Sequence, residues 1–178
     1  MKLDVRYATD ENFLHEVLYP QARVFLQRPA AEALARVHQH LREQGFGLIV
    51  FDGYRPWRIT KKMWDDTPRE KHKFVADPSQ GSRHNRGCAV DLTLLDLGTE
   101  EPAAMPSDYD EFSPRAYANY TGGSAQRRLN RDFLRREMER EGFKVYPYEW
   151  WHFDYQGWEQ FPVMDFEIED IDRLKLPK

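Results

Sequence analysis

Two histidines and two acidic residues stand in segments whose composition suits a metal site. His84 and Asp91 are seven residues apart, and Glu149 and His152 follow much later in an aromatic segment. Two imidazoles and one carboxylate can bind zinc and leave its fourth position open to water, as in catalytic rather than structural zinc sites. A remaining carboxylate beside that water can take its proton. These residue types predict a zinc hydrolase.

Asp91 stands in an apolar setting that favours a role as a ligand. A strand is predicted over 87–95, with Val90 and Leu92 on either side of Asp91. A carboxylate in such a strand is costly to bury unless it is paired or bound to a metal. The spacing of His84 and Asp91 is a weak pattern by itself, so a surface histidine and a salt-bridged aspartate remain the alternative.

Glu149 and His152 lie among Trp150, Trp151 and Phe153. Ionisable groups in aromatic surroundings are usually partnered or functional. Strict alternation along a strand would place Glu149 and His152 on opposite faces, so a common site requires a twist or a bulge there. The alternative is an amphipathic strand whose polar residues face water.

Three further residues could take part in such chemistry. Arg55 follows an apolar run, and its guanidinium either stabilises an oxyanion or forms an ion pair with Asp52. Cys88 is expected on the face of its strand opposite Asp91, as a small core residue rather than a ligand. No G-x-S-x-G motif accompanies Ser82, so a serine nucleophile is not predicted.

Helices and strands must position these residues, and they are interspersed along the chain without a repeated βαβ pattern. This order indicates an α+β fold with a small central antiparallel sheet flanked by helices. We expect one domain over residues 1–178. Leu129, Phe133 and Met138 are expected to form the buried stripe of the last helix. The predicted elements are helices over 29–44, 56–65 and 124–141, strands over 46–51, 87–95 and 143–155, a surface loop over 67–81 and a long loop over 96–123.

Composition excludes several classes of protein. The chain has 178 residues, 40% of them hydrophobic, and a net charge of −4 without a basic tract, which argues against a nucleic-acid partner. No apolar run approaches the ~18 residues of a membrane span. The N-terminus has no apolar stretch typical of a secretory signal, and the single cysteine, Cys88, excludes an intrachain disulfide. Both features lead us to expect a cytoplasmic protein.

Three ordered motifs resemble the D-alanyl-D-alanine dipeptidases of the vancomycin-resistance type. These enzymes belong to the zinc D,D-peptidase family, which shares a fold with the Hedgehog signalling domain. The resemblance extends from about Leu3 to Asp165. The motifs are Gly53-Tyr54-Arg55-Pro56, Ser82-x-His84-x-x-Gly87-x-Ala89-x-Asp91 and Glu149-Trp150-Trp151-His152-Phe153.

The resemblance implies a role for each of the residues considered above. His84, Asp91 and His152 are similar to the ligands of a single zinc ion. Glu149 is similar to the catalytic base, and Arg55 to the group that stabilises the transition state.

Two more residues correspond to substrate contacts in the family. Ser82 is similar to the serine that contacts the dipeptide carboxylate, and Asp110 to the aspartate that holds the substrate amine. Here the chain departs from the family, because Pro106-Ser107 stands where a Gly-Thr pair is usual. The departure bears on the amine clamp and on strictness for dipeptide length.

The activity implied is hydrolysis of D-alanyl-D-alanine, a small dipeptide, to free D-alanine. One alternative is a D,D- or L,D-carboxypeptidase that trims peptidoglycan peptides with the same zinc ligands and a longer cleft. Another is a zinc-containing binding module without catalysis. The presence of both Glu149 and Arg55 argues against the module, because a purely structural site has no use for a base.

Overall fold

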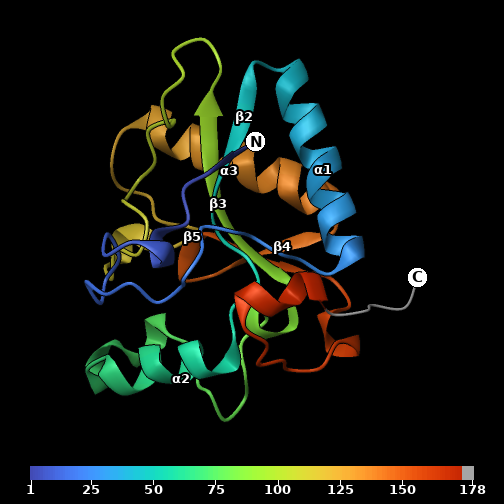
Figure 1. Cartoon of the computed structure of the whole chain (residues 1–178). Coiled ribbons are helices and arrows are strands. Elements are labelled where there is room, and N and C mark those ends of the chain that lie inside the picture. The colour runs from blue at the N-terminus through green and yellow to red at the C-terminus, as the bar shows by residue number, and fades with distance from the viewer. Residues whose placement is uncertain (174–178) are drawn as a thin grey trace.

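The computed structural model describes residues 1–173, and within them the chain forms one five-stranded sheet with helices packed around it (Figure 1). The strand order is β1-β2-β3-β5-β4. The strands are β1 (Lys2–Leu3), β2 (Phe46–Asp52), β3 (Ala89–Asp96), β4 (Phe143–Tyr146) and β5 (Glu149–Tyr155), and the α-helices are α1 (Arg28–Glu43), α2 (Trp57–Asp66) and α3 (Ala125–Arg140).

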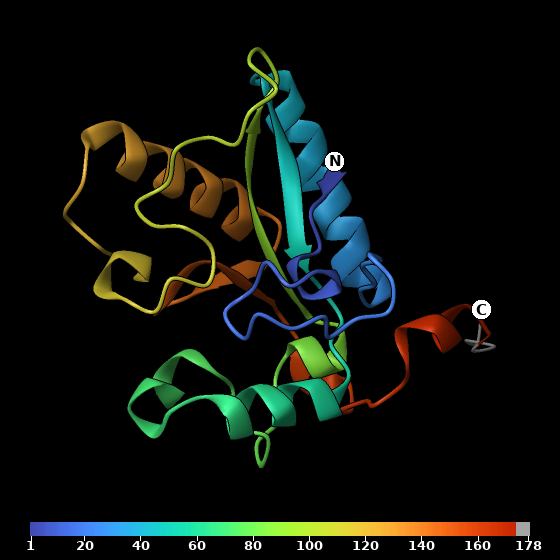
Figure 2. The same ribbon diagram turned by 60° about the vertical axis from the view of Figure 1, so that its left-hand side comes forward.

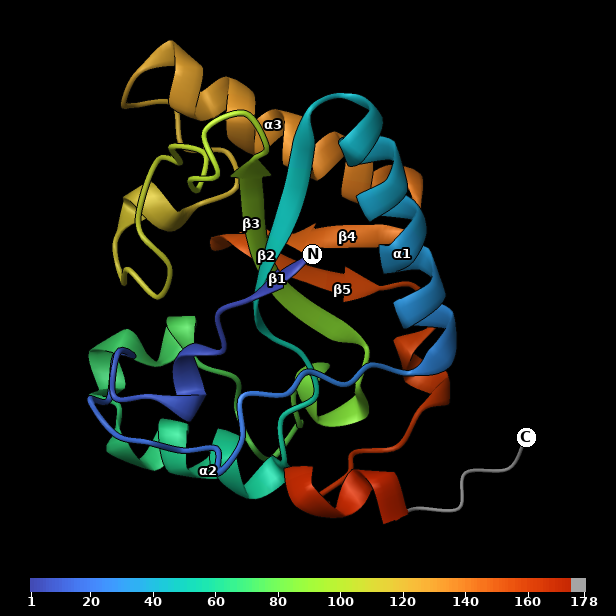
Figure 3. The ribbon, with the colours of Figure 1, turned by 45° about the horizontal axis from the view of Figure 1, so that its top comes forward.

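The sheet is antiparallel in the main, as the sequence predicts, but the single strand predicted over 143–155 is two strands, β4 and β5. β2, β3, β5 and β4 are antiparallel neighbours, whereas the two-residue β1 joins the edge of β2 in parallel. The sheet is therefore antiparallel except at one short edge. Figure 3 shows β4 and β5 running at a steep angle to β2 and β3, as the twist of antiparallel strands allows.

Helices α1 and α3 pack against each other and against the sheet. The apolar stripe of α1 is buried as predicted, at Leu34, Val37 and Leu41, and these side chains join apolar residues of β2 and β3 in one core. α1 begins with a proline in its first turn, which suits that position.

The buried face of α3 differs in part from the prediction. The Ser124 side chain accepts a hydrogen bond from the backbone N–H of Arg127 and so caps the helix as expected. Met138 is buried, but Leu129 is 61% exposed and Leu134 occupies the core instead. Five residues of helix rotate the chain by about 500°, so Leu129 and Leu134 cannot face the same side.

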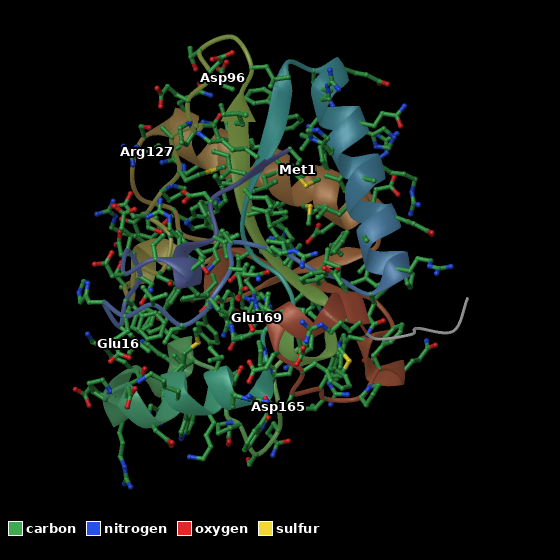
Figure 4. The ribbon with its side chains drawn as sticks, in the orientation of Figure 1. Met1, Glu16, Asp96, Arg127, Asp165 and Glu169 are labelled. Atoms are coloured by element: carbon green, nitrogen blue, oxygen red, sulfur yellow. The ribbon has the colours of Figure 1, made fainter. Side chains whose placement is uncertain are left out.

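A second group of segments surrounds the lower end of β2 and β3. Figure 2 shows α2 there, away from α1 and α3. No side chain of its own caps α2, and instead the Asp165 Oδ1 atom accepts a hydrogen bond of 2.9 Å from the backbone N–H of Arg58. Figure 4 places Asp165 beside the start of α2, at the opposite end of the molecule from Asp96. A segment distant in sequence thus completes the helix terminus.

The segment 67–81 is more ordered than the predicted surface loop. It contains a 3₁₀ helix at Arg69–Phe74, in which Phe74 is buried. The Phe74 ring stacks on Phe112 with ring centroids 5.0 Å apart. The prolines and polar residues of this segment predicted a loop, and the sequence pattern did not show that Phe74 anchors it.

Among residues 1–173, none of the helices combines the length and the apolar character that crossing a membrane requires.

Candidate active site

Three donor atoms from distant parts of the chain converge on one point. His84 Nε2 lies 3.1 Å from His152 Nδ1 and 3.3 Å from Asp91 Oδ1, and the last two atoms are 3.0 Å apart. In a tetrahedral site with zinc bonds of about 2.0–2.1 Å, neighbouring ligand atoms lie about 3.3 Å apart. This triangle therefore has the dimensions that a divalent metal ion requires, and these residues form a group that could hold one.

The hydrogen bond on the outer side of each imidazole ring fixes which ring nitrogen faces the triangle. His84 Nδ1 donates a hydrogen bond of 2.6 Å to the carbonyl oxygen of Gly53, and His152 Nε2 donates one of 2.9 Å to Asp154 Oδ1. Because a carbonyl or carboxylate oxygen can only accept, those nitrogens carry the protons of the neutral rings. The opposite nitrogens then present lone pairs to the triangle, as metal-binding histidines do.

The carboxylate of Asp91 fits the same interpretation. Its Oδ2 atom accepts a hydrogen bond of 3.0 Å from Tyr109, while Oδ1 is buried and has no hydrogen-bond partner among residues 1–173. Burial opposes ionisation, whereas positive charge on protonated His84 and His152 holds the pKa of Asp91 well below its usual range, and a metal ion in the triangle would supply that positive charge when the rings are neutral. A buried, ionised oxygen without a hydrogen bond is satisfied by a cation.

Strand pairing explains how two of these residues meet. Asp91 on β3 and His152 on β5 are direct cross-strand partners. His84 lies in a 3₁₀ turn, His84–Arg86, just before β3. The turn ends at Gly87, whose φ of +66° is strained for a residue with a side chain. This glycine lets the chain reverse so that His84 returns to the start of β3.

The bulge required of β5 is present. Tyr146 pairs with Glu149 and the preceding Val145 pairs with Phe153, so one step along β4 corresponds to four along β5. This irregularity breaks strict alternation and brings the carboxylate Oε2 of Glu149 within 3.9 Å of His152 Nδ1. Burial raises the pKa of Glu149 to about 8, against the opposing effect of His152. Such a carboxylate accepts a proton readily.

For Arg55, the structure shows the ion pair with Asp52, which is one of the two alternatives left open by the sequence. Its Nε and Nη2 atoms donate to Asp52 Oδ2 at 3.0 and 2.8 Å. Asp52 also accepts a hydrogen bond of 2.9 Å from Tyr19 through Oδ1, which fixes the pair further. Arg55 Nη2 nevertheless lies 4.0 Å from Asp91 Oδ2, and the residue lines the cavity described below. The ion pair therefore holds the guanidinium beside the donor triangle.

Asp110 and Ser82 both lie in the walls of the same cavity as the donor triangle. Asp110 Oδ2 accepts a hydrogen bond of 3.0 Å from Tyr7. Burial raises the pKa of Asp110 to about 7, and the negative charge of Asp91 acts in the same direction. Ser82 Oγ accepts a hydrogen bond of 3.2 Å from the backbone N–H of His84, and its hydroxyl group donates no hydrogen bond to another of residues 1–173.

The unusual Pro106-Ser107 pair has a clear structural role. Ser107 Oγ accepts a hydrogen bond of 2.8 Å from Trp150 Nε1 and donates one of 3.0 Å to the carbonyl oxygen of Asp108. This serine ties the loop that carries Asp110 to β5. At the position where the chain departs from the family pattern, Ser107 therefore anchors the loop.

The cavity has a volume of about 350 Å³. Part of its wall comes from the segment 67–81 and from α2, so the predicted surface loop contributes to the site. Residues of the donor triangle, Glu149, Arg55, Asp110 and Ser82 share this one space.

Cys88 was predicted to be a small core residue rather than a metal ligand. Cys88 is fully buried, burial raises its pKa to about 12, and it is not among the metal-binding group of residues 1–173.

Sequence reasoning missed Tyr7, Tyr109 and Asp154. Asp154 follows His152 by two, which places it on the same face of a strand and could have marked it. Tyr7 and Tyr109 lie in irregular segments without a periodic signal.

Comparison with known proteins agrees with this geometry. A family model described as D-ala-D-ala dipeptidase matches residues 1–168. The chain belongs to this family. It is 30% identical over 164 residues to the D-alanyl-D-alanine dipeptidase of Escherichia coli (strain K12), covering 92% of this chain and 83% of that protein. It is 33% identical over 174 residues to the enzyme of the same name from Enterococcus faecium, with coverage of 86% and 85%.

A solved structure gives the likeness of fold. The chain superimposes on the LdcB LD-carboxypeptidase with a TM-score of 0.50 at 22% sequence identity. The match covers 76% of this chain and 61% of the other. The α+β architecture predicted from the sequence is thus the architecture of a peptidase fold.

Proposed function

We propose that this protein is a zinc-dependent dipeptidase that hydrolyses D-alanyl-D-alanine, and similar D,D-dipeptides, to free D-alanine. One observation carries the proposal: a zinc-sized triangle of donor atoms stands beside a buried carboxylate, Glu149, in the wall of a single cavity. Membership of the dipeptidase family and the names of its relatives supply the substrate.

In the proposed site, His84, Asp91 and His152 hold the zinc ion. When bound there, zinc polarises the scissile carbonyl group and makes water a nucleophile near neutral pH. Glu149 takes the proton of the attacking water and later delivers it to the nitrogen of the leaving D-alanine. Its raised pKa suits both transfers.

Arg55 stabilises the oxyanion that forms as the carbonyl carbon becomes tetrahedral. Its ion pair with Asp52 fixes the guanidinium before substrate arrives. A donor that is already in place stabilises developing charge without reorganisation at the moment of reaction.

The two charged ends of a free dipeptide need partners in the same cavity. Asp110, oriented by the hydroxyl group of Tyr7, is proposed to bind the substrate ammonium group. Ser82 is proposed to donate a hydrogen bond to the substrate carboxylate through its hydroxyl group. These roles rest on the family resemblance and on the presence of both residues in the cavity wall.

Metal analysis of the purified protein, coupled to an assay of D-alanine release with and without a chelator, tests the proposal. We expect about one zinc ion per chain and hydrolysis that stops when zinc is removed and resumes when it is returned. N-acylated D-alanyl-D-alanine and longer peptides, assayed in parallel, should be poor substrates. Preference for those peptides would instead establish the carboxypeptidase alternative, and bound zinc without any hydrolysis would establish a binding module.

Two broader statements belong to the same proposal. We propose that residues 1–178 form one domain, which the continuous sheet with helices from both halves of the chain supports. We also propose a cytoplasmic location, in keeping with a single, reduced cysteine.

A further inference from the structure

Arg83 stands in the cavity wall between two residues that already have proposed roles, Ser82 and His84. Its guanidinium carbon lies 4.4 Å from the ring centroid of Trp158, and its Nε atom lies 3.6 Å from Asp154 Oδ2. The Nε atom is buried and has no hydrogen-bond partner among residues 1–173. A guanidinium packed over an aromatic face keeps its N–H groups, which point outward in its own plane, available for an anion.

The other arginine and lysine side chains of the cavity wall have hydrogen-bond partners. Arg55 is held by two hydrogen bonds to Asp52. The Nζ atom of Lys73 donates a hydrogen bond of 3.2 Å to the hydroxyl group of Tyr117. Arg83 is therefore the cation in the described wall of the cavity with the greatest unused hydrogen-bonding capacity.

Different chains of contacts connect Asp110 and Arg83 to the donor triangle. Asp91 Oδ2 faces Arg55 Nη2 at 4.0 Å, and Arg55 lies over the ring of Tyr7, 5.0 Å from its centroid; the Tyr7 hydroxyl group binds Asp110. These contacts connect Asp91 of the triangle to Asp110, the proposed partner of the substrate ammonium group.

A second chain of contacts connects His152 of the triangle to Arg83. His152 donates from Nε2 to Asp154 Oδ1, and the other oxygen of Asp154 is the one close to Arg83. The cavity therefore has an anion, Asp110, beyond one donor and a cation, Arg83, beyond another. An extended dipeptide spans about 7 Å, so its two charged ends need partners at separate points of the cavity.

We propose that Arg83 binds the C-terminal carboxylate of the substrate and thereby selects peptides with a free C-terminus. This inference rests on the proposed function and deepens it. Ser82 alone offers that carboxylate a neutral hydroxyl and no counter-ion. Arg83, the next residue, supplies the positive charge and can donate two parallel hydrogen bonds.

The test compares two substrates in the zinc-loaded full chain. D-alanyl-D-alanine carries the carboxylate, and D-alanyl-D-alaninamide replaces it with a neutral carboxamide. We expect the wild-type protein to favour the acid by at least about tenfold in kcat/KM, as the loss of one charge-assisted hydrogen bond predicts. Arg83→Met should remove most of this preference by raising KM for the acid, with kcat and the amide reaction nearly unchanged. Arg83→Lys should restore part of it.

Arg86→Met is the matched control. The Arg86 guanidinium carbon lies 5.2 Å from the same Trp158 ring, but Arg86 donates to the carbonyl oxygen of Phe161 and does not line the cavity. This variant should keep the wild-type preference for the acid. An acid-to-amide ratio that Arg83→Met leaves unchanged would overturn the inference while the proposed function stands.

Binding separates the two proposals further. Titration of D-alanyl-D-alanine into zinc-loaded Glu149→Ala protein measures affinity without turnover, and adding Arg83→Met should weaken binding at least about tenfold. If the wild-type protein does not hydrolyse the dipeptide, the proposed function fails, and this Arg83-dependent loss of affinity still supports the inference. Equal affinity of the single and double variants, or no binding by either, overturns it.

Discussion

The two faces of β3 differ in what holds them together. On one face, Val90, Leu92 and Leu94 join the apolar core beneath α1 and α3. On the other, Asp91 belongs to a cluster of buried charges with histidines, Arg55 and carboxylates. The first face is stabilised by removal of apolar surface from water, which is non-directional. The second depends on the positions of individual atoms, because a buried charge is stable only with correctly placed partners.

This difference teaches where substitutions should affect stability and where they should affect chemistry. A change on the helix-covered face should alter the free energy of unfolding and spare the site. A change on the site face should alter turnover or metal affinity and leave most of the core unchanged.

The largest expected effect is on the site face, at Glu149. Glu149→Ala should lower kcat by roughly 10³-fold or more, because it removes the group that accepts and returns the proton. Zinc content, measured by metal analysis, should remain at about the wild-type level since Glu149 is outside the donor triangle. Near-normal hydrolysis by this variant would show that the base lies elsewhere.

Arg55→Ala should lower kcat by about 10²–10³-fold, as expected for the loss of an oxyanion donor. Steady-state kinetics with D-alanyl-D-alanine measures it. Because Asp52 would lose its partner, thermal unfolding of the same variant must be measured as well. A loss of stability without any loss of kcat would mean that the arginine only supports the fold.

On the helix-covered face, Leu94→Ala should reduce the free energy of unfolding by about 2–5 kcal/mol, because the side chain is fully buried and leaves a cavity. Denaturant unfolding gives this value, and kcat of the folded protein should stay within about twofold. Leu129→Ala is the control, since Leu129 is 61% exposed and should change stability by less than about 0.5 kcal/mol. A comparable loss in both variants would contradict the assignment of the core.

The smallest expected effect is at Asp154, which orients His152 without belonging to the donor triangle. Asp154→Ala should weaken zinc binding by about 10–100-fold, the usual result of removing a hydrogen-bond partner of a metal-binding histidine. Competition with a chelator of known affinity measures the change. Unaltered zinc affinity would mean that packing alone fixes the His152 ring.

The helix-covered face could be read from the sequence because its signals are local. The stripe at Leu34, Val37 and Leu41 follows helical periodicity, and the cap at Ser124 lies within a few residues of what it caps. The prediction was wrong at Leu129 of α3. This apolar residue lies outside the buried stripe of its helix, and its apolar character alone does not show which way it faces.

The site face was predictable only in part. Residue types and the family resemblance singled out all seven of the candidate residues, and the seven lie around one cavity. Their partners were not predictable in the same way: the Gly53 carbonyl oxygen as an acceptor for His84 and Tyr7 as a donor to Asp110 come from segments far apart in sequence.

By itself, the sequence determined the chemical inventory: two imidazoles, the acids, one guanidinium, and the periodic apolar residues that specify helices and strands. Only the tertiary structure decided that Asp91 and His152 are paired across two strands, that a bulge turns Glu149 toward them, and that Arg83 faces the cavity. The physical reason is one of range. Periodicity and capping act within a few residues, whereas three donor atoms about 3 Å apart depend on how whole strands pair and twist.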